Sequence, residues 1–154
     1  VLESLLRAQR DWQFLHFGAT KCLPLPNVHV MAWRPPLQLQ QVIAKLDVGL
    51  MPYDCYSNKN FHCMPLKVFD YFSTGLPVVS TPIVNLWEFS DTIYFGDDAD
   101  ELSRAIQSAL DEPADSPKKS ARIAIAKEHS IEGLAACLAD VLSSHGLLVR
   151  QTKC

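Results

Sequence analysis

The stretch from Pro65 to Pro82 constrains the fold most, because it predicts a helix, an abrupt stop and a buried strand in immediate succession. Pro65 suits the first helical position, where a missing N–H costs nothing. Gly75 can take the left-handed conformation that closes a helix, and Pro77 prevents its continuation. One helical face is apolar, with residues at spacings of three: Leu66, Phe69 and Phe72. Val78-Val79 then centre a short apolar strand, as parallel sheets require.

The remaining chain alternates in the same way. Helical patterns are expected over residues 1–9, 37–47, 98–111, 117–128 and 130–144, and a short helix or turn over 83–90. Ser116 and Ser130 are the expected N-caps of the last two helices. Strands are expected over residues 12–17, 28–31, 48–51, 78–81 and 92–95. Short apolar strands separated by helices indicate parallel βαβ units. We therefore predict an α/β, Rossmann-like, doubly wound parallel sheet forming one domain over 1–146, with a tail over 147–154. The opening at Val1 reads as the interior of a helix, so we expect a piece of a longer chain.

Charge and cysteine usage exclude several classes. A net charge of −3 is unlike that of a nucleic-acid binder, and no apolar run reaches the length of a membrane span. The cysteines, at positions 22, 55, 63, 137 and 154, are odd in number and form no Cys-x-x-Cys pair. That pattern predicts reduced thiols rather than a disulfide framework. His62-Cys63 near Cys55 matches no standard zinc spacing, so no metal site is predicted.

The start of the central helix is a candidate anion site. Met64, before Pro65, cannot cap the helix, which leaves the N–H groups of Leu66 and Lys67 without an obvious side-chain partner. The positive end of the helix dipole favours an anion such as phosphate there, and Lys67 adds a full charge. The alternative is that water, Asn58 or Asn60 caps the helix and Lys67 is solvated.

Ligands of open α/β sheets bind beyond the carboxyl ends of the strands. In this chain those ends carry Gly18, Trp33-Arg34, Tyr53-Asp54 and Thr81-Pro82. The start of the central helix lies at the same edge, because it follows the strand over 48–51. The sequence therefore favours a phosphate-bearing ligand at this edge.

Several segments, taken in order, resemble a known family. They are Asn27-Val-His-Val-Met, Leu46-Asp-Val-Gly-Leu-Met-Pro-Tyr, the run from Pro65 to Thr81, and His129-Ser-Ile-Glu. Together they resemble the C-terminal domain of nucleotide-sugar-dependent glycosyltransferases of the GT-B architecture. The pattern is most similar to the retaining group 1 type that builds bacterial polysaccharides.

The resemblance implies specific roles at the central helix. The family often has two Glu residues separated by seven others, one facing the transferred sugar and the second binding the ribose. These positions fall on His62 and Asp70 here. Asp70 keeps two acceptor oxygens for the ribose hydroxyls, whereas His62 loses the carboxylate. The resemblance makes Lys67 a donor-phosphate contact and makes Met64 and Leu66 backbone contacts; a weak Lys67–Asp70 surface pair is the alternative.

The same resemblance places the nucleobase pocket near Trp33 and Arg34, with Tyr53 and Asp54 bordering it. Trp33 either stacks on the base or fills space under its loop, and Arg34 either contacts the donor or is a surface residue. The family's basic phosphate-binding residues near the start of the domain, and its N-terminal acceptor domain, are absent from this sequence. We therefore expect the isolated domain to be inactive.

The implied function is transfer of a sugar from a UDP- or GDP-linked donor to a carbohydrate or lipid-linked acceptor, with no separate cofactor and no nucleic-acid partner. His62 and Lys67 are the candidate catalytic residues. The expected location is cytoplasmic, at the inner membrane surface if the acceptor is lipid-linked. Three alternatives stay open: a nucleotide-sugar epimerase, a non-catalytic interaction domain that kept the fold, and, ranked last, a flavodoxin- or receiver-like domain.

Overall fold

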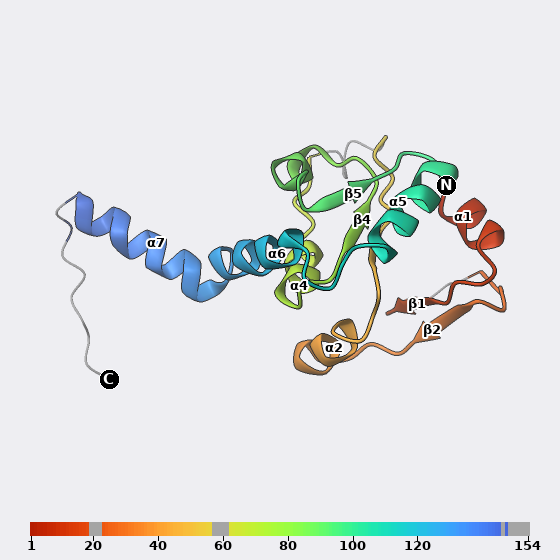
Figure 1. Cartoon of the computed structure of the whole chain (residues 1–154). Coiled ribbons are helices and arrows are strands. Elements are labelled where there is room, and N and C mark those ends of the chain that lie inside the picture. Colours follow the sequence, from red (N-terminus) through yellow and green to blue (C-terminus); the bar gives the residue numbers. More distant parts are fainter. Residues whose placement is uncertain (19–22, 57–61, 146, 148–154) are drawn as a thin grey trace.

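The computed structural model describes residues 1–154 except 19–22, 57–61, 146 and 148–154, and its described elements are of the α/β class (Figure 1). The helices are α1 (Leu2–Ala8), α2 (Pro36–Ile43), α4 (Lys67–Ser73), the 3-10 helix η1 (Val84–Phe89), α5 (Ala99–Leu110), α6 (Pro117–Glu128) and α7 (Ile131–Ser144). The strands are β1 (Phe14–Phe17), β2 (Val28–Met31), β3 (Gly49–Met51), β4 (Val78–Ser80) and β5 (Ile93–Phe95). The predicted order of elements is confirmed, with several ends shorter than expected. The predicted tail over 147–154 lies almost wholly outside the described residues.

All strand pairs are parallel, as predicted, but they form two sheets rather than one continuous sheet. β1 pairs with β2, with Phe14 opposite Val28. β3, β4 and β5 pair in that order, with Leu50 opposite Val79 and Val79 opposite Tyr94. Within the described residues, β1 and β3 are therefore both end strands.

The larger sheet is covered by helices on both faces, which is the doubly wound arrangement. Successive strand residues point to opposite faces, so Val78 and Val79 enter two different cores. Val78 packs with residues of α4, η1 and α6, including Phe72, Leu86 and Ala126. Val79 packs with residues of α1 and α5, including Leu5 and Leu102.

The central helix starts later than the sequence suggested. α4 begins at Lys67 with Leu66 as its N-cap, and Pro65 lies outside it, so placing Pro65 at the first helical position was wrong. The N–H groups of Val68 and Phe69 donate to the carbonyls of Pro65 and Leu66, so a tight turn precedes the helix. The other end is as predicted: Gly75 has φ +74°.

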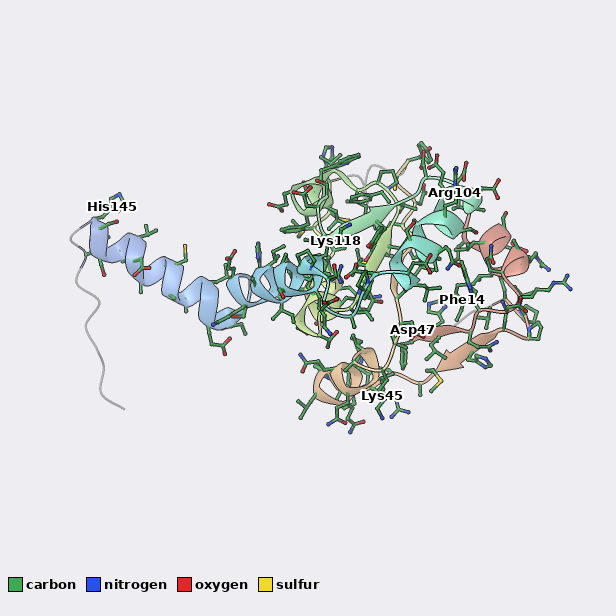
Figure 2. All side chains as sticks on the ribbon, in the orientation of Figure 1. Phe14, Lys45, Asp47, Arg104, Lys118 and His145 are labelled. Carbon is green, nitrogen blue, oxygen red and sulfur yellow. The ribbon has the colours of Figure 1, made fainter. Side chains whose placement is uncertain are left out.

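The last helix, α7, extends away from the body of the molecule beyond α6, which packs against α4 (Figure 1). Ser116 and Ser130 cap α6 and α7 through hydrogen bonds from the N–H groups of Lys118 and Gly133, as the sequence predicted. No residue of α7 is buried, and its side chains project outward as far as His145 (Figure 2). None of the described helices combines the length and the apolar character needed to cross a membrane.

Candidate functional site

The candidate site is built on the carboxyl end of β3 and on the start of α4. The loop after β3 is held by Thr81, just past β4, whose Oγ1 donates to the carbonyl of Tyr53 at 2.9 Å. The backbone N–H of Thr81 also donates to the carbonyl of Met51 at 3.3 Å. These hydrogen bonds fix the residues after β3 to the end of β4. The carboxyl ends of these two strands therefore have a fixed position relative to each other.

Lys67 and Asp70 lie together on the first turn of α4, as the spacing predicts. Partial desolvation raises the pKa of the Asp70 carboxyl, and the positive charge of Lys67 opposes that rise. Among the described residues, no side-chain hydrogen bond caps α4, and the alternative caps Asn58 and Asn60 lie outside those residues. Because the turn at Pro65 and Leu66 precedes it, α4 has only seven residues. A helix this short has a small dipole, so most of the attraction for an anion would come from the charge of Lys67.

Tyr71 is a neighbour that the sequence analysis did not single out. Its phenol lies near Tyr53 and Asp70, and burial, followed by these two groups, raises the pKa of Tyr71 to about 12. Burial, with a contribution from Cys63, also raises the pKa of Tyr53. The Tyr71 ring fits against Gly49, where an added Cβ would lie 2.6 Å from the ring. A glycine inside an apolar strand marks such a close approach, and that signal was available in the sequence.

Residues that flank the loop after β3 contact other elements. Asp54 is exposed and accepts a hydrogen bond from the N–H of Tyr56 at 3.1 Å. The Tyr56 hydroxyl donates to Asp97, ahead of α5, at 2.7 Å. His62 is exposed, and its carbonyl accepts from Asn85 Nδ2 on η1 at 3.0 Å. The loop therefore bridges from β3 to η1 and to the start of α5.

The two predicted backbone contacts differ in their surroundings. Met64 is half-buried and packs against the core formed by α4, η1 and α6. Leu66, at the N-cap position of α4, is 72% exposed. Of the two residues, Leu66 is thus the more exposed.

The other candidates lie on the smaller sheet. Gly18 follows β1 with φ +72° and donates its N–H to the carbonyl of Met31. Trp33, after β2, is 74% exposed, so it does not fill space under its loop. Arg34 is half-buried, and among the described residues its Nε has no hydrogen-bond acceptor. These residues follow the strands of the two-stranded sheet, which is separate from the three-stranded sheet beside α4.

Among the described residues, no group of three or more His, Cys, Asp or Glu side chains is arranged to hold a metal ion. Cys55, Cys63 and Cys137 are free thiols, whereas Cys22 and Cys154 lie outside the described part of the chain. The prediction that no metal is used stays a prediction.

A family model described as "Glycosyl transferase-like" matches residues 1–140. The chain belongs to this glycosyl transferase-like family. It is also similar to TuaH of Bacillus subtilis (strain 168), whose name describes it as a candidate teichuronic acid biosynthesis glycosyltransferase. The two are 29% identical over 130 residues, which cover 76% of this chain and 32% of TuaH. The glycosyl transferase-like domain thus spans about a third of that relative.

Membership of the family confirms the resemblance found in the sequence and agrees with the parallel α/β fold. It does not assign roles to single residues. Among the candidates, Asp70 lies near Lys67, and Tyr71 lies near both Asp70 and Tyr53. Gly18, Trp33 and Arg34 form a second group, on the smaller sheet.

Proposed function

We propose that this domain binds the nucleotide-sugar donor of a glycosyltransferase, UDP- or GDP-linked, and that the full-length protein transfers the sugar to a carbohydrate or lipid-linked acceptor. The family match over residues 1–140 carries the proposal. The position of Lys67 and Asp70 together on the first turn of α4, the helix that follows β3, supports it.

In this proposal the chemistry is mainly stabilisation of a leaving group. When the bond between sugar and diphosphate breaks, negative charge grows on the departing diphosphate. A fixed cation and backbone N–H groups stabilise that charge more in the transition state than in the bound donor. Lys67 supplies the cation, and the open backbone at Leu66 supplies N–H donors. No cofactor is needed for this step.

Asp70 is the proposed ribose contact. A carboxylate can accept hydrogen bonds from two vicinal hydroxyls only while it is ionised. Partial burial raises the pKa of the Asp70 carboxyl, and the positive charge of Lys67 opposes that rise and so favours the ionised form. His62 faces the transferred sugar in this proposal, and Trp33, Arg34, Tyr53 and Asp54 border the nucleobase. The unpartnered Nε of Arg34 supports a role as a hydrogen-bond donor to the ligand.

The acceptor is proposed at the level of chemical class. The name of TuaH refers to teichuronic acid biosynthesis, which supports a polysaccharide or its lipid-linked precursor as the acceptor. Such an acceptor would place the full-length protein at the inner surface of the membrane. We propose that the isolated domain binds donor without turnover, because the acceptor site belongs to the N-terminal part.

Calorimetric titration of the full-length protein with UDP and with GDP tests the donor site and identifies the base. We expect Lys67→Ala to weaken binding about tenfold or more, since hydrogen bonds to charged groups contribute about 1.5–3 kcal/mol. Lys45→Ala is the matched control, because Lys45 is an exposed lysine before β3, at the opposite edge of the sheet (Figure 2). Equal binding by both variants and the parent protein would remove Lys67 from the site.

The same titration distinguishes the rival functions. A non-catalytic domain of the same fold would bind neither nucleotide in the full-length protein. A nucleotide-sugar epimerase would bind UDP but would convert a UDP-sugar to its epimer without an acceptor. Product analysis by NMR after incubation with the donor alone separates the epimerase from the transferase, which releases the nucleotide only when an acceptor is added.

A further inference from the structure

His129 ends α6 with a hydrogen bond that fixes both the place of its ring and its tautomer. It is the C-cap residue of α6, and its Nδ1 lies 2.9 Å from the carbonyl oxygen of Ile125, four residues earlier. A carbonyl oxygen can only accept, so Nδ1 carries the proton and donates. The hydrogen bond therefore holds the imidazole at the end of α6 in both the neutral and the protonated form.

The face of this imidazole lies against α4. It stacks on the ring of Phe69, with 4.5 Å between the ring centroids and 15° between the ring planes. Phe89 of η1 meets both rings edge to face, with its centroid 5.9 Å from that of Phe69 and 5.7 Å from that of His129. Stacked and edge-to-face pairs at such separations are favourable arrangements of aromatic rings. The three rings therefore connect α4, η1 and the end of α6.

The contact lies at the start of α4 because α6 runs antiparallel to α4. Arg122, in the middle of α6, donates to the carbonyl of Gly75, which lies just beyond the end of α4. His129, just beyond the end of α6, stacks on Phe69 in the first turn of α4. The end of α6 is therefore next to the helical turn that carries the candidate ligand contacts.

Two side chains attach this first turn to the rest of the molecule. Val68 is fully buried in the core formed by α4, η1 and α6, and Phe69 is half-buried against the same core. Lys67 and Asp70, on either side of them in the sequence, are exposed. With Val68 as its only anchor, the turn could pivot about that side chain. The stacked ring of Phe69 supplies a second fixed point and so sets the direction of the exposed pair.

We propose that His129 is a positioning residue for the donor site, which acts by stacking on Phe69. The stack holds the first turn of α4 in the orientation in which Lys67 and Asp70 face the ligand. This inference rests on the proposed function, because it concerns the same site. When the stack is lost, fewer molecules have the turn in the binding orientation, and the apparent affinity for the ligand falls by the same factor.

His145 provides a matched control, because it ends α7 in the way that His129 ends α6. It is the C-cap residue of α7, and its Nδ1 lies 2.9 Å from the carbonyl of Val141, four residues earlier. Its ring lies at the far end of α7, away from α4 (Figure 2). His145→Ala therefore removes the same kind of hydrogen bond without removing a contact to α4. His129→Phe is the complementary variant, because it keeps a ring to stack on Phe69 but loses the hydrogen bond.

NMR titration of the Asp70 carboxyl in the full-length protein, without any nucleotide, tests the positioning step alone. Partial burial raises the pKa of Asp70, so this pKa reports where the first turn lies. We expect His129→Ala to lower the pKa of Asp70 toward its ordinary value, because a loosened turn is more hydrated. His129→Phe and His145→Ala should leave the pKa as it is in the parent protein. An unchanged or higher pKa in His129→Ala, or equal shifts in the two alanine variants, would overturn the proposal.

Calorimetric titration of the same full-length variants with UDP and with GDP tests the effect on the donor site. We expect His129→Ala to bind the nucleotide about three- to tenfold more weakly than the parent protein, which is the range that the loss of a ring pair allows. His129→Phe should bind within about twofold of the parent protein, because the stack is kept. His145→Ala should bind as the parent protein does. Equal affinities of the two alanine variants would contradict the role of His129.

The two measurements separate failure of this inference from failure of the proposed function. If the parent protein binds neither UDP nor GDP, the proposed function fails, and the titration of Asp70 still decides whether His129 positions the first turn of α4. If the parent protein binds a nucleotide and His129→Ala binds it equally well, the donor site stands and the positioning role of His129 is overturned.

Discussion

The guanidinium of Arg122, on α6, forms a buried ion pair with the carboxylate of Glu112 through both of its terminal nitrogens. Arg122 is fully buried. Its Nε donates to the carbonyl of Gly75 at 3.1 Å, and one Nη donates to the carbonyl of Thr92 at 3.2 Å. Tyr94 donates its hydroxyl to Glu112 at 2.9 Å. The pair thus connects α6 to the residues that end α4 and to β5.

We expect Arg122→Met to lower the free energy of unfolding by about 3–5 kcal/mol, because it leaves the carboxylate of Glu112 buried without a cationic partner. Arg7→Met is the control: Arg7 pairs with Glu3, but both side chains are more than half exposed. Exposed pairs contribute at most about 1 kcal/mol. Urea unfolding of both variants makes the comparison, and similar losses would contradict a structural role for the buried pair.

The same pair predicts a pH dependence of stability. Burial alone would raise the pKa of Glu112, but hydrogen bonds from Arg122 and Tyr94 and the charge of Arg122 outweigh burial and lower it. A lowered folded-state pKa gives stability that is present above the unfolded value, about 4.3, and is lost as the pH falls toward the folded pKa. We expect stability to decrease below about pH 5. In Glu112→Gln the decrease should be smaller, and an unchanged slope between pH 5 and 3 would rule out Glu112 as a contributor.

Capping serines and a glycine in the sequence correctly predicted several helix ends. Ser116 and Ser130 cap the helices they were expected to cap, and Gly75 has the positive φ expected after α4. In each case the necessary hydrogen bond or dihedral angle involves residues within a few positions. Asp98, ahead of α5, also accepts from the N–H of Glu101.

Contacts between residues far apart in the sequence could not be predicted from local patterns. Glu112 lies just after α5 and Arg122 lies in the middle of α6, and nothing in the local sequence indicates that they meet in the interior. Tyr71 was not expected in the site for the same reason, since its position depends on how α4 lies against β3. The break between the sheets depends on which strands become neighbours. Of the candidate site, the position of Lys67 and Asp70 on the helix after β3 was predictable, while the division of the strands into two sheets was not.

Among the described residues, Gly18 and Gly75 are the glycines with positive φ, and together they separate the cost of backbone strain from the cost of steric crowding. Gly18 has φ +72° with no atom within 4 Å of an added Cβ, whereas at Gly75, with φ +74°, the Cβ would lie 2.7 Å from Cγ of Lys119. We expect Gly18→Ala to cost about 1–2 kcal/mol from the left-handed backbone alone. Gly75→Ala should cost more, because Lys119 and Ile123 must also move. Chemical denaturation measures both, and a smaller loss for Gly75→Ala would contradict the crowding.

The contact between Gly49 and Tyr71 can be tested by a double-mutant cycle. An added Cβ at Gly49 would lie 2.6 Å from Cδ2 of the Tyr71 ring, so Gly49→Ala must displace the ring or the strand. Crowding of this kind costs about 1–3 kcal/mol. In a Tyr71→Ala background the ring is absent, and we expect Gly49→Ala to cost almost nothing. Unfolding free energies of the four proteins give the coupling energy, expected at about 1–3 kcal/mol. Gly49→Ala alone should also weaken nucleotide binding, if the Tyr71 ring positions Tyr53 and α4. Equal losses of unfolding free energy for Gly49→Ala in both backgrounds would show that Tyr71 does not pack on β3.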